Sequence, residues 1–445
     1  MRRVYVLACA SLLAAACAAG PAGPPSQDTG LQTTLFEGAR LIVGDGETVE
    51  DAAFLVEADT VAAVGRRGDV PAPAGATRVD LAGKTVMPAL LDLHSHLGYT
   101  DIATMDTSPV HYTRENLIDQ LRRYAYHGIG LTLSLGLDRG ELPYQLRAEA
   151  LPDTARFLTA GRGIAMPGAG PRALHWRDAA YGVTTRDEAI AAVLELAAAR
   201  VDIVKIWVDD RNGTVEKLPA ALYGPIIAAA HEHGLRVVAH VYYLEDAKAL
   251  LRAGVDGFAH GVRDLEVDDE FVDLMLERPN VFLLPNLPDT APGPDDLAWL
   301  AETLPPGQID QMREALAGTT PARPPLFDTQ ARSLARLNAA GVRIGFGTDA
   351  GIGPPLGWSA HAELADMVAA GLSPAEALRA ATGTSAAILG RDDLGMVAEG
   401  RSADFVVLDA NPLDDIRNTR RIADVYLRGR PVDRAALREG WVGRR

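Results

Sequence analysis

The 445-residue sequence predicts an α/β fold, in which a (β/α)8 TIM barrel carries a small β-sandwich built from both chain ends. Segments typical of strands and helices alternate through the middle of the chain, as they do in parallel βαβ units. Because a barrel of this kind takes about 250 residues, the chain has room for one barrel and a smaller companion domain. Eight candidate strands begin near Thr85, Leu131, Ala155, Asp202, Arg236, Gly257, Val281 and Arg343.

The first residues are typical of a bacterial targeting segment, which does not belong to the fold. Arg2 and Arg3 supply positive charge, and the uncharged run 4–16 that follows is too short to cross a bilayer as a helix. Small residues directly precede Cys17, as in a lipobox. We therefore predict a signal peptide over residues 1–16 and a lipid on Cys17, with cleavage without lipidation as the alternative.

Residues 17–30 are rich in Ala, Gly, Pro and Ser and are typical of a flexible tether. Ala18 carries no acidic retention signal, so we expect a periplasm-facing lipoprotein of the outer membrane; a soluble secreted or periplasmic protein is the alternative. The other cysteine, Cys9, lies within the signal peptide. The mature protein therefore has no disulfide, and its metal ligands cannot be thiolates.

Short β-type runs occupy both ends of the remaining chain. Several lie within residues 31–84, separated by turn residues, and two lie within 403–445. We predict that these two segments form one β-sandwich and that residues 85–402 form the barrel.

Helix signals place the elements of the middle part. Thr185 and Glu188 form a capping box, in which each residue satisfies a free amide of the other, and they open a helix that runs to about Arg200. Ser373 and Glu376 form another, with proline at the first helical position. Between them, strands are predicted at 202–208, 235–241 and 256–260, and helices at 219–233 and 245–253. An open, doubly wound sheet is the alternative architecture.

A pair of histidines ends the first predicted barrel strand. His94 and His96 stand two residues apart, so their imidazoles project from the same face of a strand. Barrels place their chemistry at the carboxyl ends of strands. Two imidazoles fixed in this way are suitable ligands for a borderline metal such as zinc.

Lys205 lies in the strand Ile203–Val208, whose other residues are apolar. Only four of the 43 basic residues are lysines, so a lysine in such a strand is unusual for this chain. A buried ammonium is costly to desolvate and loses its proton readily. Either Lys205 pairs with a carboxylate such as Asp202 or Asp209, or its neutral amine captures carbon dioxide and becomes a carbamate.

His240, His260 and Asp349 end three further strands. Each alone fits an ordinary structural role, that of a hydrogen-bonded core histidine or, for Asp349, of a helix cap or loop carboxylate. Together with the histidine pair and the lysine, they occupy the ends of the first, fourth, fifth, sixth and eighth strands in that order. This order is much more specific than any one of its members.

The ligand order resembles that of the amidohydrolase superfamily. The resemblance covers most of the chain and includes the runs Gly371–Leu378 and Gly400–Asp404. Within the superfamily, the sequence is similar to the imidazolonepropionase-like group, which includes bacterial Xaa-Pro dipeptidases.

The resemblance implies a binuclear metal site. The implied ligands are His94, His96 and Asp349 for one metal and His240 and His260 for the other, with carboxylated Lys205 as a bridge. The two divalent ions, for which zinc is our prediction, would share a hydroxide, because metal charge lowers the pKa of bound water from 15.7 to about 7. We expect this hydroxide to attack the scissile carbonyl, and Asp349 to pass its proton to the leaving amine.

Three further residues are candidates for substrate contact. Tyr242 follows His240 by two residues and resembles the tyrosine of the dipeptidases that donates a hydrogen bond to the scissile carbonyl. Its alternative role is to fill the barrel mouth. His175 and Arg162 are candidates for binding a substrate carboxylate.

These observations predict a metal-dependent hydrolase that cleaves a non-cyclic amide bond in a small molecule, with a dipeptide or an N-acyl amino acid as the expected substrate. A cyclic amide, a lactone or a phosphotriester is the alternative for the same site. A non-catalytic surface-binding lipoprotein is the alternative of a different class. The formal charge of -16 argues against nucleic acid as a partner, and membrane contact is expected only through Cys17.

Overall fold

The computed structural model describes residues 33–171, 174–287, 291–318, 323–351 and 355–443, and for Leu174 and His175 it describes the backbone alone. The predicted signal peptide, the lipidation site Cys17 and the tether lie outside these residues. Within the described part of the chain, no helix combines the length and the apolar character needed to cross a membrane.

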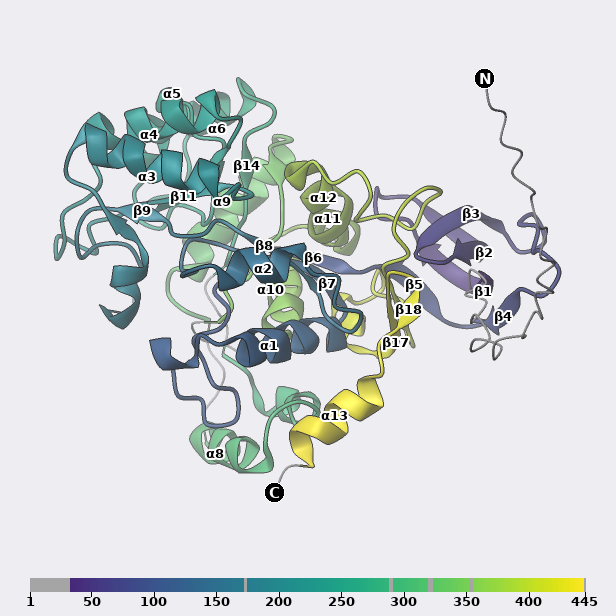
Figure 1. The fold of residues 1–445 in the computed structure, drawn as a ribbon. Coiled ribbons are helices and arrows are strands. Elements are labelled where there is room, and N and C mark those ends of the chain that lie inside the picture. The colour runs from purple at the N-terminus through teal and green to yellow at the C-terminus, as the bar shows by residue number, and fades with distance from the viewer. Residues whose placement is uncertain (1–32, 172–173, 288–290, 319–322, 352–354, 444–445) are drawn as a thin grey trace, which may run out of the picture.

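One part of the described chain is a mixed sheet of eight strands, which lies to one side of the parallel strands (Figure 1). Its strands are β1 (Thr33–Ile42), β2 (Thr48–Glu57), β3 (Thr60–Arg66), β4 (Thr77–Asp80), β5 (Thr85–Pro88), β16 (Phe405–Leu408), β17 (Ile422–Leu427) and β18 (Arg430–Pro431). Their order is β18-β17-β16-β5-β1-β2-β3, with β4 beside β1. Both chain ends contribute strands to this sheet, as predicted. The packing of two sheets face to face, which defines a β-sandwich, stays a prediction.

Aromatic pairs form the core of this sheet. Phe36 and Phe54 face each other across β1 and β2 and stack with their ring centroids 5.0 Å apart. Phe405 and Tyr426 do the same across β16 and β17, at 4.7 Å. Phe405 meets both rings of the first pair edge-on at 5.1 Å. The strands of the two chain ends therefore share one aromatic core, in the offset and edge-on geometries that rings favour.

In the other part, eight parallel strands are found among the described residues in the order expected for a (β/α)8 chain. They are β6 (Leu90–Ser95), β7 (Ile129–Ser134), β8 (Arg156–Thr159), β11 (Val204–Val208), β12 (Val237–Val241), β13 (Gly257–Phe258), β14 (Phe282–Leu283) and β15 (Arg343–Ile344). One sheet contains β6 to β8, and another contains β11 to β15 with the short β9 (Ile164–Ala165) and β10 (Tyr181–Gly182). The arrangement is like a TIM barrel, although the two sheets do not join into one closed ladder.

Hydrogen bonds outside the ladders bridge the edges of these sheets. Asp202 N donates to Thr159 O at 2.9 Å beside β8 and β11, and Leu93 N donates to Phe346 O at 2.9 Å beside β6 and β15. The second contact brings the carboxyl end of β6 next to the segment that follows β15. The histidine pair and Asp349 are thereby placed side by side.

The predicted first barrel strand is two strands in the structure. Thr85–Pro88 is β5 and pairs with β16 in the mixed sheet, and the chain then passes Ala89 before β6 begins. Proline has no amide hydrogen to continue a ladder, and Ala89 N donates instead to Asp404 O at 3.0 Å. The apolar run is continuous because both strands are buried, so hydrophobicity alone did not reveal the break.

The described residues also contain thirteen α-helices, most of which lie around the parallel strands (Figure 1). They are α1 (Arg114–Tyr126), α2 (Leu142–Ala148), α3 (Arg186–Ala198), α4 (Ala220–Glu232), α5 (Leu244–Ala253), α6 (Asp269–Leu276), α7 (Leu297–Leu300), α8 (Pro306–Leu316), α9 (Phe327–Ala339), α10 (Trp358–Ala369), α11 (Pro374–Arg379), α12 (Ser385–Leu389) and α13 (Arg434–Val442). Both predicted capping boxes are present, at the starts of α3 and α11.

The last segment, which we assigned to the β-sandwich, ends in the helix α13. Trp441 packs this helix against α1, because its indole donates to Asp119 at 2.6 Å and meets the ring of Tyr126 edge-on at 5.5 Å. Leu437 and Trp441 stand four residues apart and so lie on one side of the helix. Asp433 caps its first turn by accepting from Ala436 N at 2.9 Å.

A layer of apolar side chains fills the space inside the parallel strands. Leu93, Ile203 and Val238 belong to it. Side chains alternate along a strand, so residues two positions farther on point the same way. These residues are Lys205 on β11 and His240 on β12, so both lie on the carboxyl side of the apolar layer. Lys205 is the second residue of β11 and does not end the strand, contrary to the prediction.

Candidate metal centre

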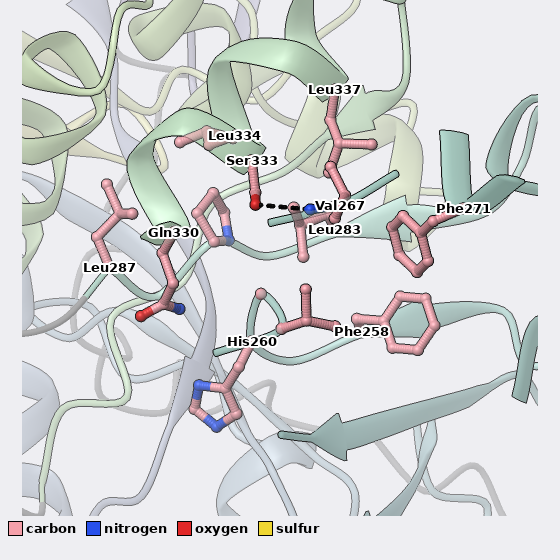
Figure 2. A pocket seen from close by; sticks show the side chains of 13 residues that line it. Phe258, His260, Val267, Phe271, Leu283, Leu287, Gln330, Ser333, Leu334 and Leu337 are labelled. Atoms are coloured by element: carbon pink, nitrogen blue, oxygen red, sulfur yellow. Dashed lines mark hydrogen bonds between the residues drawn. The ribbon is translucent and has the colours of Figure 1, made fainter. Parts of the chain in front are cut away.

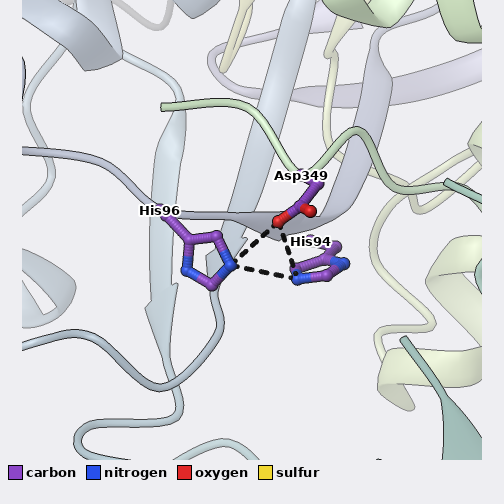
Figure 3. A group of neighbouring side chains, drawn as sticks. All are labelled: His94, His96 and Asp349. Carbon is purple, nitrogen blue, oxygen red and sulfur yellow. Dashed lines mark hydrogen bonds and ion pairs between the residues drawn. The ribbon is translucent and has the colours of Figure 1, made fainter. Parts of the chain in front are cut away.

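Three predicted ligands form a compact group at the carboxyl ends of the strands (Figure 3). The nearest ligand atoms of His94, His96 and Asp349 all lie within 4.8 Å of one another. Oδ1 of Asp349 is 3.0 Å from Nε2 of His96 and 3.3 Å from Nε2 of His94, and these two nitrogens are 3.2 Å apart. Two imidazole nitrogens and a carboxylate oxygen thus turn toward one point, as ligands of a divalent metal do.

A buried carboxyl, Asp92, holds together the two segments that carry these ligands. It accepts from the backbone amide of His94 and from the amide and hydroxyl of Thr348, which precedes Asp349. Tyr124 of α1 donates to it at 2.9 Å. Burial raises the pKa of Asp92 to about 7, against the effect of these hydrogen bonds. Asp92 therefore ties the end of β6 to the loop after β15.

The loop after β15 approaches β6 so closely that it requires glycine. A Cβ on Gly347 would lie 2.7 Å from Cβ of His94, and one on Gly351 would overlap the carbonyl group of His96. Between these glycines, Asp349 has a φ of 55°, in the left-handed region that few other residue types adopt. Local backbone strain is thus part of how the carboxylate is aimed at the histidines.

His240 and His260 lie directly beside this group. Their ring centroids are 4.7 Å apart, and the ring of His260 is 4.9 Å from that of His94. Nε2 of His260 is 3.8 Å from Oδ2 of Asp349. Burial lowers the pKa of His94, His240 and His260 below the ordinary value, that of His240 to about 3. The rings are therefore neutral and keep a lone pair that can bind a metal.

Lys205 is fully buried, and within the described residues its amine has no hydrogen-bond partner. Its Nζ lies 5.4 Å from the centroid of the Trp207 ring. Burial lowers the pKa of this amine to about 7; the charge of Asp349 opposes this shift, and those of Arg211 and Arg263 add to it. The amine is consequently easy to deprotonate at neutral pH.

The two carboxylates that we considered as partners of Lys205 form other contacts. Asp202 lies 3.3 Å from Arg147. Asp209 lies 2.9 Å from Nε2 of His240 and 2.9 Å from Arg211. The salt-bridge alternative for Lys205 is therefore absent from the described ion pairs.

Tyr242 follows β12 and is partly exposed. Its ring meets that of Tyr243 at 5.0 Å between centroids, and its carbonyl accepts from the backbone amide of Arg263 at 2.8 Å. These contacts fix its backbone next to the segment after β13. Its hydrogen bond to a substrate stays a prediction.

The two candidates for carboxylate binding lie after β8. Arg162 donates to the carbonyls of Ala179 and Ala180, at 2.8 and 3.1 Å, and lies 4.0 Å from the centroid of the Tyr181 ring. These contacts hold the end of η2 (Leu174–Ala179), a 3-10 helix. His175 belongs to η2, but its side chain is outside the described ones. Both assignments stay predictions.

The roles of two polar residues behind the predicted ligands were not predicted from the sequence, which gave Asp209 only as a possible partner of Lys205 and did not single out Asn286. Asp209 accepts from Nε2 of His240, and Oδ1 of Asn286 accepts from Nδ1 of His94, both at 2.9 Å. Each hydrogen bond fixes the ring hydrogen on one nitrogen and leaves a lone pair on the other. The nitrogens that remain able to bind a metal are Nδ1 of His240 and Nε2 of His94. Burial acts to raise the pKa of Asp209, but the hydrogen bond from His240 and nearby positive charge lower it to about 2. The position of Asn286 just after the seventh strand was the available signal.

A small cavity lies on the helix side of His260 (Figure 2). Figure 2 shows the ring of His260 at its edge, pointing away from Ser333. The space open to the centre of a water molecule is about 20 Å³, which is enough for roughly one water. Both amide atoms of Gln330, which lines the cavity, are buried without a hydrogen-bond partner in the described structure. The cavity therefore suits a water molecule and is too small for a substrate.

The fold and this cluster define a class of protein. The sequence profile of the amidohydrolase family matches residues 85–432, and the chain belongs to this family. The protein is accordingly an enzyme, a hydrolase whose family is generally metal-dependent, and the cluster of two histidines and an aspartate fits a divalent metal.

Individual relatives agree with the predicted group. The chain is 26% identical over 380 residues to an imidazolonepropionase of Streptomyces griseus, covering 81% of this chain and 86% of the relative. A solved structure of a prolidase candidate from Bifidobacterium longum superposes with a TM-score of 0.71 at 27% identity, covering 92% of this chain and 99% of that one. An Xaa-Pro dipeptidase with bound methionine superposes with a TM-score of 0.70 over 90% of this chain and 99% of its own, and at 22% identity it shows the fold alone.

Proposed function

We propose that the protein hydrolyses a non-cyclic amide bond of a small molecule at a binuclear metal site. The proposed ligands are His94, His96 and Asp349 for one divalent ion and His240 and His260 for the other, with a carbamate on Lys205 between them. Zinc is the ion that this set of imidazoles and oxygens favours. The observation that carries the proposal is the convergence of these side chains next to a buried amine that has no hydrogen-bond partner among the described residues.

Carbamate formation suits the surroundings of Lys205. The ammonium first loses a proton, and the neutral amine nitrogen then bonds to the carbon of carbon dioxide with release of a second proton, so a buried cation is replaced by an anion with two oxygens. This would remove a desolvated positive charge and give the site an anionic oxygen donor that could hold the metals. When bound, the metals would supply a water acidic enough to act as a nucleophile at neutral pH and would polarise the scissile carbonyl.

Asp349 is placed to move the proton. Its Oδ1 faces His94 and His96, and its Oδ2 faces His260, so the carboxylate lies between the two proposed metal positions. It would accept a proton from the attacking water and deliver it to the leaving amine. Tyr242, next to the segment after β13, would donate a hydrogen bond to the scissile carbonyl.

A dipeptide or an N-acyl amino acid is the substrate class that we propose, supported by the structural similarity to prolidase-like proteins. A cyclic amide is the second candidate, favoured by the identity to an imidazolonepropionase over most of both chains. A panel containing both bond types, assayed on purified protein, separates the two.

We also propose that a lipid on Cys17 tethers the mature enzyme to the periplasmic face of the outer membrane. The small residues before Cys17 and the short apolar run support this. Cells fed a tagged fatty acid should label the wild type and leave Cys17→Ala unlabelled, and an unlabelled wild type would contradict the tether.

Lys205→Ala tests the metal site. We expect two metals per chain and amide hydrolysis in the wild type, and loss of both in the variant. Lys217→Ala is the matched control, because Lys217 is partly exposed and pairs with Asp246 at 2.7 Å. Protein supplied with ¹³C-labelled bicarbonate should show a carbamate carbon in its NMR spectrum that Lys205→Ala lacks. Equal metal content and activity in all three proteins would overturn the binuclear site.

A further inference from the structure

Two arginines stand beside the proposed second metal position. Arg211 follows β11 by three residues and Arg263 follows β13 by five, so both extend from the carboxyl ends of parallel strands. Arg211 contacts Asp209, which holds His240, and Arg263 contacts His260 directly. The two guanidinium groups thus flank one pair of proposed ligands.

Arg211 is held in place from several sides. Its Nη1 lies 2.9 Å from Oδ2 of Asp209, its Nη2 donates to Gly170 O at 2.5 Å, and its backbone amide donates to Oδ1 of Asp209 at 2.9 Å. Its Nε is buried and has no hydrogen-bond partner in the part of the chain that the structure describes. Because its side chain is still 17% exposed, it is a fixed group that a ligand in the barrel mouth can reach.

Arg263 is held next to Tyr242, since its backbone amide donates to Tyr242 O at 2.8 Å. Its guanidinium donates to Nδ1 of His260 at 3.0 Å. An imidazole that binds a metal through Nε2 carries its hydrogen on Nδ1 and cannot accept there. Nε2 is the nitrogen of His260 that faces Asp349. A His260 that serves as a ligand in this orientation therefore no longer accepts a hydrogen bond from Arg263.

The positive charges at this place interact with one another. Burial and the charges of Arg263 and Arg177 lower the pKa of Arg211, whereas Asp209 raises it. Asp209 also accepts from His240, so it is shared between two donors. Several guanidinium groups therefore lie close together at the mouth of the predicted active site, although the formal charge of the whole chain is -16. An anionic ligand compensates such a group of like charges.

We propose that Arg211 and Arg263 form a carboxylate-binding pair that selects substrates with a carboxylate close to the scissile amide. A guanidinium group matches a carboxylate through two parallel hydrogen bonds, which lysine cannot provide. Arg162, by contrast, directs its donors to the backbone carbonyls of Ala179, at the end of η2, and of Ala180, just before β10. The inference rests on the proposed amide hydrolysis and specifies which substrates that reaction takes.

The first test compares an N-acetyl amino acid with its C-terminal carboxamide. We expect Arg211→Gln and Arg263→Gln each to lower the ratio of kcat/KM for the carboxylate to kcat/KM for the carboxamide by roughly 10- to 100-fold, mainly through a higher KM for the carboxylate. Arg211→Lys and Arg263→Lys keep the charge and should retain part of the discrimination. Arg417→Gln is the matched control, because Arg417 is 72% exposed and pairs with Asp415. Equal losses on both substrates would overturn the proposal.

The second test does not depend on turnover. Binding of 3-phenylpropionate, a monocarboxylate without an amide, is measured by titration calorimetry on proteins of equal metal content and again after chelation. We expect its affinity to fall at least about tenfold in both glutamine variants and to be unchanged in Arg417→Gln. Equal affinity in all proteins would mean that Arg211 and Arg263 do not bind the carboxylate, which would then bind elsewhere, for example to the metals.

The two tests separate this inference from the proposed function. If the wild type hydrolyses neither substrate but binds 3-phenylpropionate through both arginines, the proposed function fails and the carboxylate site stands. If both glutamine variants hydrolyse the carboxylate and the carboxamide as fast as the wild type, the proposed function stands and the two arginines do not bind the substrate carboxylate.

Discussion

Two groups of buried histidines in this protein have opposite surroundings. The four histidines at the strand ends turn toward Asp349 and toward one another. His127 and His361 lie instead where the end of α1 meets α10, and their rings pack on Trp299 with centroids 4.6 and 5.0 Å apart. Nδ1 of His361 bonds to Thr419, and its Nε2 donates to the carbonyl of His127.

Burial alone does not identify a metal ligand. Burial lowers the pKa of His240 and of His361 alike, to about 3 in both cases. The groups differ in what the ring nitrogens face. At the strand ends, each ring turns its Nε2 toward a carboxylate, whereas both ring nitrogens of His127 lack a hydrogen-bond partner in the described structure. Only the histidines at the strand ends bring several nitrogen and oxygen lone pairs to one place, as a metal site requires.

The largest effect that would test this comparison is expected from Asp349→Asn. The amide keeps the shape of the side chain but cannot take up a proton, so kcat should fall by about 10³-fold. Asparagine tolerates the left-handed backbone at this position, so thermal unfolding should change little. His127→Phe, at the other group, should leave kcat unchanged. If kcat of Asp349→Asn stays within tenfold of the wild-type value, Asp349 does not transfer the proton.

A smaller effect is expected from Asp209→Asn, which leaves every proposed ligand in place. The variant no longer forces His240 to carry its hydrogen on Nε2, so metal affinity should fall by roughly 10- to 100-fold. Competition with a chelator measures it. Asp256→Asn is the matched control, because Asp256 pairs with the surface histidine His231 at 2.8 Å. Equal metal affinity in both variants would mean that Asp209 does not orient His240.

The smallest effect is a pH-dependent change in stability at the second group. Burial places the pKa of His127 well below the ordinary value and that of His361 at about 3, whereas an unfolded histidine has a pKa of about 6.5. As the pH falls below 6.5, the unfolded chain binds protons that the folded chain does not. Each of these histidines therefore lowers stability by up to about 1.4 kcal/mol per pH unit in that range.

His127→Phe removes one of these two groups and keeps a ring beside Trp299. We expect the variant to gain stability relative to the wild type between pH 6.5 and 5, and to differ little from it at pH 8. Urea unfolding at pH 5.5 and pH 8 gives the two differences. The same difference at both pH values would mean that His127 is not held neutral in the folded protein.

Much of the metal site could be predicted because it depends on local geometry. The spacing of His94 and His96 places both rings on one face of a strand, and the apolar residues around Lys205 mark a buried strand. The capping boxes are equally local, since each joins residues three apart. The break between β5 and β6 could not be predicted in this way, because two buried strands read as one apolar run.

By itself, the sequence determined the order of the strands and which of them contain or are followed by a histidine, a lysine or an aspartate, because these depend on residues close together in the chain. Only the tertiary structure decided which side chains stand behind them. Asp209 could have paired with Lys205 on its own strand but bonds to His240, 31 residues away, and Asn286 reaches His94 across 192 residues. Such contacts depend on how the strands pack, since a carboxylate or an amide bonds to whichever donor the fold brings nearest.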